Sequence, residues 1–83
     1  MSVANVLTPY GNRSGASGVR AYRIGACQIS VQFADGTTYD YSYASTGRDK
    51  VEQMKALARA GAGLSTFISQ QVRDAYASRH DQP

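Results

Sequence analysis

Two alternating segments flank an Asp-Gly pair near the middle of the chain, and they constrain the fold more than any other feature. In Gln28–Phe33 the apolar residues fall at every second position, and in Thr37–Tyr43 every odd position after the first is a tyrosine. This period is typical of half-buried strands, and Asp35-Gly36 is typical of a hairpin turn. A further strand over Val19–Ile24, followed by a tight turn, predicts a three-stranded antiparallel meander.

The length of the hairpin loop decides which way the tyrosines point. With a two-residue loop, Val31 faces Asp40 and the tyrosines lie on the outer face as an exposed aromatic platform. With a three-residue loop that ends in a left-handed glycine, Val31 faces Tyr39 and Ile29 faces Tyr41. We favour the three-residue loop, because the alternative would bury the Asp40 carboxylate at a cost of several kcal/mol. We therefore expect mostly buried tyrosines whose hydroxyls reach the rim of the core.

The apolar period changes after Tyr43, which predicts helices. Thr46 to Asp49 fits a capping box with Thr46 as the N-cap. A first helix follows, with one apolar face made by Val51, Met54, Leu57 and Ala58. Gly61–Gly63 ends it, and a second amphipathic helix is expected from about Leu64 to Ser78.

The order of these elements predicts an α+β fold of the type β-β-β-α-α. A three-stranded antiparallel meander is followed by two helices that pack on one of its faces. We expect residues 1–18 to form a flexible N-terminal tail, residues 19–79 a single domain, and residues 80–83 a disordered C-terminus.

Length, charge and cysteine usage bound the function classes. The chain has 83 residues and a net charge of +3, which fits one small domain and is too mild a charge to establish a nucleic-acid partner. Cys27 is the only cysteine, so a disulfide within the chain is excluded, and we expect it to be buried. The first residues do not resemble a signal peptide and no segment is long and apolar enough to span a bilayer, so a cytoplasmic protein is expected.

Signals of catalysis are weak. The single histidine, His80, falls in the predicted tail, where it cannot be held in a working geometry. One histidine and one cysteine far apart do not supply a metal site. Gly61–Gly63 lacks the ending of a phosphate-binding loop and is better explained as a helix terminus. We therefore expect no enzyme activity, no cofactor and no metal.

Signals of binding are stronger. The first predicted helix carries a stripe of charged residues, Arg48, Glu52, Lys55 and Arg59. This stripe is either a solvated face, which is the simpler interpretation, or a ridge that follows phosphates. Arg73, on the polar side of the second predicted helix, could pair with an acid such as Asp40 or contact a ligand. The tyrosines could stack on bases, although the favoured register argues against this for Tyr39 and Tyr41.

The segment from Ser17 to Tyr76 resembles the KTSC domain family, which is named for its occurrence at the C-terminus of some lysyl-tRNA synthetases. The matching residues are Ile29–Phe33, Gly36, Tyr39-Asp40-Tyr41, Ala60 with the glycine-rich break after it, Phe67, and Val72–Tyr76. Ser69 stands where the family often has Asn. The resemblance implies a small α+β module, suggests RNA as a ligand because of the fusion to a synthetase, and supplies no catalytic residue.

These observations lead to two hypotheses. The first is a non-enzymatic binding module whose most favoured ligand is RNA. Tyr39, Tyr41, Arg73 and Tyr76 match the family's motif positions, and Arg48, Lys55 and Arg59 would contact phosphates. The alternative is a protein-interaction module, such as a phage- or mobile-element-encoded inhibitor of a host complex, that docks on an acidic surface or pairs through an edge strand.

Overall fold

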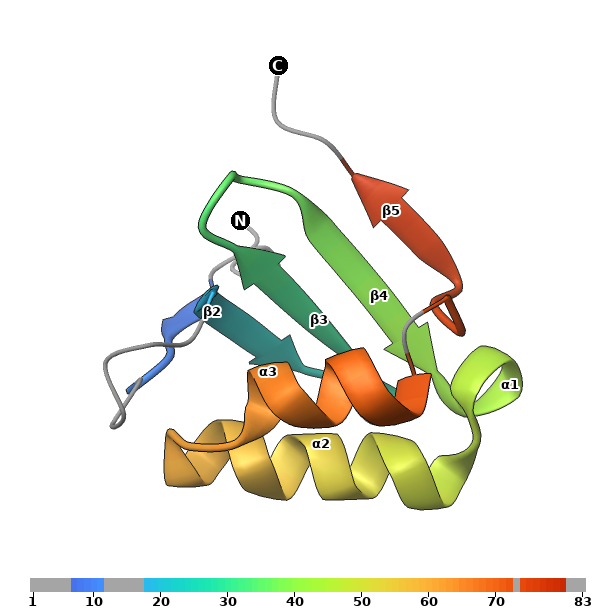
Figure 1. Ribbon diagram of the computed structural model, residues 1–83. Helices are drawn as coiled ribbons and strands as arrows, with labels where there is room; N and C mark the ends of the chain where they lie inside the picture. The colour runs from blue at the N-terminus through green and yellow to red at the C-terminus, as the bar shows by residue number, and fades with distance from the viewer. Residues whose placement is uncertain (1–6, 12–17, 73, 81–83) are drawn as a thin grey trace, which may run out of the picture.

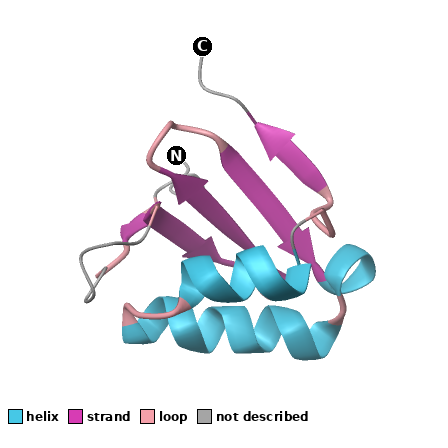
Figure 2. Ribbon diagram, viewed as in Figure 1, coloured by secondary structure: helices cyan, strands magenta, loops and turns pink. Residues whose placement is uncertain are grey.

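The computed structural model describes residues 7–11, 18–72 and 74–80. Its five strands form one antiparallel sheet in the order of the sequence, and the helices lie together on one face of that sheet (Figures 1 and 2). The elements are β1 (Thr8–Pro9), β2 (Val19–Ile24), β3 (Gln28–Phe33), β4 (Thr38–Ser42), α1 (Tyr43–Thr46), α2 (Arg48–Ala60), α3 (Leu64–Phe67), the π-helical turn η1 (Ile68–Val72) and β5 (Ser78–His80). The predicted α+β class is confirmed.

The central hairpin has the predicted register. Ile29 pairs with Tyr41 and Val31 with Tyr39, and the Phe33 amide donates to the Thr37 carbonyl across a three-residue loop. Gly36 has a φ of 93°, in the left-handed region that a side chain would disfavour. The three-residue loop therefore places Tyr39 and Tyr41 on the same face as Ile29 and Val31.

The sheet has two more strands than the predicted meander. β1 pairs with β2, and β5 pairs with β4, so that each forms one edge. Residues 8–10 thus differ from the predicted flexible tail: Tyr10 is only 7% exposed, and its hydroxyl accepts a hydrogen bond from the Leu64 amide at 3.2 Å. The rest of the predicted tails, residues 1–6, 12–17 and 81–83, lies outside the described residues.

The predicted N-cap at Thr46 is wrong. A four-residue helix, α1, comes first, with Ser42 as its N-cap in a capping box with Ser45. Gly47 is the N-cap of α2 and has a φ of 104°, a conformation that only glycine adopts readily. Thr46 instead donates its hydroxyl to the Ala75 carbonyl at 2.7 Å, which ties α1 to the segment that precedes β5.

The second long helix is shorter than predicted. α3 continues into η1 and ends at Val72, whereas the pattern predicts a helix to Ser78. Ala75 and Tyr76 have helical spacing with the residues before them but lie in the connection to β5. α2, α3 and η1 nevertheless cover the sheet with apolar side chains, and the core comprises Tyr10, Val19, Ile29, Val31, Tyr41, Val51, Met54, Ala58, Leu64, Ile68 and Val72.

Two further observations concern the surface. Cys27, expected to be buried, is exposed, because it lies in the turn between β2 and β3 rather than within a strand. Within the described residues, no helix has the length and apolar character needed to cross a membrane.

Candidate functional site

Tyr41, a predicted nucleic-acid contact, is a core residue. Its side chain is fully buried at 0% exposure. The hydroxyl has no hydrogen-bond partner among the described residues, and burial raises its pKa. The prediction that the tyrosine hydroxyls reach the rim is therefore wrong for Tyr41, which is fully buried.

Three other aromatic side chains form a partly exposed surface on the same face, which we call the aromatic platform: Phe33, Tyr39 and Tyr76. Tyr39 and Tyr76 stack with ring centroids 4.8 Å apart and planes 29° from parallel. Phe33 lies 5.5 Å from Tyr39. All three are half-buried, because the helices cover the other end of this face and leave the end near the β3–β4 turn open (Figure 1).

A cation lies over the platform. Arg79 on β5 pairs with Tyr39 on β4, and its guanidinium group is 6.0 Å from the Tyr39 ring centroid, within the range of a cation–π contact. β5 is therefore the element that brings a positive charge to the aromatic rings. The sequence did not predict a role for Arg79, because β5 has only three residues. A strand this short shows no recognisable alternation of apolar and polar residues.

The basic residues of α2 do not join the platform. Arg48 and Arg59 are exposed at the two ends of α2, which lies at the opposite end of the molecule from the β3–β4 turn (Figure 1). The turn end of the platform is therefore remote from α2, whereas the N-terminus of α2 follows α1, which Thr46 ties to Ala75 beside Tyr76. Arg73, also a predicted contact, lies outside the described residues.

Lys55, a predicted phosphate contact, is buried and paired. The residue is only 5% exposed. Its ammonium group donates to Glu52 Oε2 at 2.9 Å and to the Ala26 carbonyl at 3.3 Å, and it lies 5.3 Å from the Tyr43 ring centroid. The hydrogen bond to Glu52 raises the pKa of Lys55. Lys55 thus fastens α2 to the β2–β3 turn.

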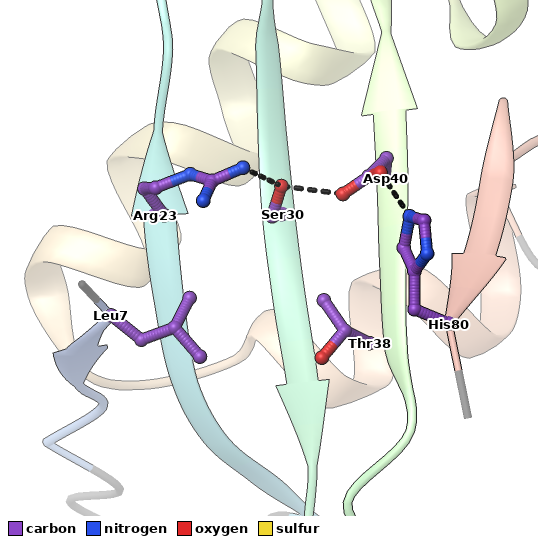
Figure 3. A pocket seen from close by; sticks show the side chains of 6 residues that line it. All are labelled: Leu7, Arg23, Ser30, Thr38, Asp40 and His80. Carbon is purple, nitrogen blue, oxygen red and sulfur yellow. Dashed lines mark hydrogen bonds and ion pairs between the residues drawn. The ribbon is translucent and has the colours of Figure 1, made fainter. Parts of the chain in front are cut away.

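The face of the sheet that carries no helix holds a line of connected polar side chains, which we call the polar row: Arg23, Ser30, Asp40 and His80 (Figure 3). The Ser30 hydroxyl donates to Asp40 Oδ1 at 2.5 Å and accepts from Arg23 at 3.4 Å. Asp40 Oδ2 lies 2.9 Å from His80 Nε2. With Leu7 and Thr38 these residues line a pocket of about 260 Å³.

The polar row is better suited to holding β5 than to catalysis. Ser78 and Asp40 both approach the same ring nitrogen of His80, at 3.4 Å and 2.9 Å, whereas a catalytic triad needs them on opposite nitrogens. Burial favours the neutral form of Asp40, but hydrogen bonds donated by Ser30, Ser78 and His80 outweigh it and hold the pKa of Asp40 below its usual value. Asp40 is therefore a shared anion that fixes the last strand.

This arrangement differs from the prediction, which placed His80 in a disordered tail. The available signal was the spacing of Ser78 and His80, two residues apart as on one face of a strand. Among the described residues there is no cluster of three or more side chains that could hold a metal ion.

Comparison of the chain with models of protein families, with curated proteins and with solved structures finds no match.

Proposed function

We propose that the chain is a small module that binds single-stranded RNA at the aromatic platform. The observation that carries the proposal is the stack of Tyr39 on Tyr76 with the Arg79 guanidinium over the Tyr39 ring. Partly exposed aromatic rings beside a cation are the usual means of holding unpaired bases and their phosphates.

RNA is preferred over DNA because the segment resembles the KTSC family, which occurs at the C-terminus of some lysyl-tRNA synthetases. Tyr39 and Tyr76 are two of the motif residues that carry this resemblance, and they are the two that stack. The net charge of +3 agrees with an anionic ligand.

The alternative role as a protein-interaction module has less support. The two edge strands that the structure describes are two and three residues long, and short edges offer little backbone for pairing with a partner's sheet.

Two matched arginine variants test the proposal with a fluorescently labelled, single-stranded RNA. Arg79→Ala should weaken binding several-fold, because it removes the cation beside the stacked rings. Arg59→Ala removes the same charge at the far end of α2 and should leave the affinity nearly unchanged. Binding of the unaltered protein should weaken markedly when the salt concentration rises from about 50 to 200 mM.

Equal losses for the two variants would show that binding is unspecific attraction to a basic protein, and would contradict the platform. Absence of binding at micromolar RNA in low salt would contradict the function itself. Circular dichroism of each variant verifies that the fold is retained.

A further inference from the structure

A pocket lies directly beside the aromatic platform, and we call it the turn pocket. It has a volume of about 190 Å³ and is lined by Phe33, Asp35, Thr37 and Tyr39. Two of its walls are aromatic rings, with centroids 5.5 Å apart and planes inclined by 51°. A planar group that enters it would therefore meet aromatic walls and the polar groups of the β3–β4 turn.

The polar groups around the turn pocket have opposite hydrogen-bonding character. Asp35 Oδ1 accepts a hydrogen bond from the Thr37 amide at 2.9 Å. This bond is the main cause that lowers the pKa of Asp35, and the nearby charge of Arg79 contributes as well. Asp35 is thus ionised at neutral pH and acts only as an acceptor, whereas the Arg79 guanidinium over Tyr39 acts only as a donor.

Among the four RNA bases, guanine matches this combination best. Its Watson–Crick edge carries two adjacent donors, N1–H and the N2 amino group, which suit a carboxylate. Its O6 and N7 are two adjacent acceptors, which suit a guanidinium group. Uracil has a single N–H donor, and adenine and cytosine have one amino group each with no neighbouring N–H.

We propose that the turn pocket binds a guanine base of single-stranded RNA, with Asp35 accepting from its N1–H and N2 amino groups and Arg79 donating to O6 and N7. This inference rests on the proposed function and adds a base preference to it. Phe33 and Tyr39 provide the aromatic walls, and Asp35 provides the selectivity.

Fluorescence anisotropy with labelled uridine-rich oligonucleotides, roughly ten nucleotides long, tests the base preference. Each oligonucleotide carries one central guanine, adenine, cytosine, inosine or 7-deazaguanine. The guanine oligonucleotide should bind about tenfold more tightly than the adenine one. Inosine lacks the N2 amino group and 7-deazaguanine lacks N7, so each should lose a large part of that advantage.

The Asp35→Asn variant tests whether the guanine preference arises in the turn pocket. Asparagine keeps the acceptor for the Thr37 amide and therefore the turn, but it loses the charge and one acceptor oxygen. The variant should bind guanine and inosine oligonucleotides about equally and keep its affinity for the adenine one. Asp49→Asn is the matched control, since Asp49 is an exposed carboxylate on α2, and it should keep the full guanine preference.

The outcomes separate this inference from the proposed function. If all oligonucleotides bind equally, or if Asp35→Asn behaves like Asp49→Asn, the guanine site is overturned while RNA binding stands. If no oligonucleotide binds at micromolar concentration in low salt, both proposals fail.

Discussion

The two faces of the sheet are buried by different means. On β3, Ile29 and Val31 face the helices and are 0% exposed, and Ser30 between them faces the side without helices and is still only 1% exposed. The first pair is covered by apolar side chains of the helices, whereas Ser30 is enclosed within the polar row by Arg23 and Asp40. A polar position in an alternating strand can thus be as buried as an apolar one, provided that its hydrogen bonds are made.

Truncation of a side chain on the helix-covered face of the sheet should cause the largest loss of stability. Ile29→Ala removes a fully buried side chain below the helices, and we expect the free energy of unfolding to fall by about 2–5 kcal/mol, measured by urea denaturation. Gln32→Ala, on the other face of the same strand and half-buried, should change it by less than about 0.5 kcal/mol. Similar losses for the two variants would show that the helices do not set the difference between the faces.

Substitution on the face of the sheet without helices should cause a smaller loss of stability, and this loss should depend on pH. Asp40 accepts from Ser30, Ser78 and His80, and hydrogen bonds to a charged group contribute about 1.5–3 kcal/mol. Because the pKa of Asp40 is lower in the folded protein, its contribution is complete above the unfolded-state value of about 3.9 and is lost as the pH falls through the lower folded-state value.

Urea denaturation between about pH 5 and pH 2 measures this contribution. Asp40→Asn should be less stable than the unaltered protein at pH 5, and the difference should shrink as the pH falls. A difference that stays constant over this range would show that the charge of Asp40 does not stabilise the polar row.

The sequence predicted the central part of the fold because its signals are local. The alternating pattern located β3 and β4, the strand signal before a tight turn located β2, and the cost of burying Asp40 beneath the helices selected the register. β1 and β5 escaped prediction because two or three residues show no period. They pair with the edges of β2 and β4, and contacts with distant residues support them: Tyr10 reaches Leu64, and Ser78 and His80 reach Asp40.

The candidate site was predictable in part. Tyr39 and Tyr76 came from the resemblance to a family, and the structure brings them together. Lys55 was expected to be exposed because it belongs to the charged stripe of the helix. It is instead buried, and its ammonium group donates hydrogen bonds to Glu52 and to the Ala26 carbonyl. Arg79 and Asp35 escaped because their proximity to Tyr39 depends on β5 and on the exact course of the turn.

The smallest expected effect concerns two buried tyrosines that differ in one hydrogen bond. The Tyr10 hydroxyl accepts from the Leu64 amide, whereas the Tyr41 hydroxyl is buried without a partner among the described residues. Tyr10→Phe should lower the free energy of unfolding by about 1 kcal/mol. Tyr41→Phe should leave it unchanged or raise it by up to about 1 kcal/mol, because an unsatisfied polar group is removed from the covered face. Equal destabilisation by both variants in urea denaturation would show that the Tyr41 hydroxyl has a hydrogen-bond partner in solution. The helix-covered face of the sheet would then resemble the face without helices, in that it buries polar groups only when they are paired.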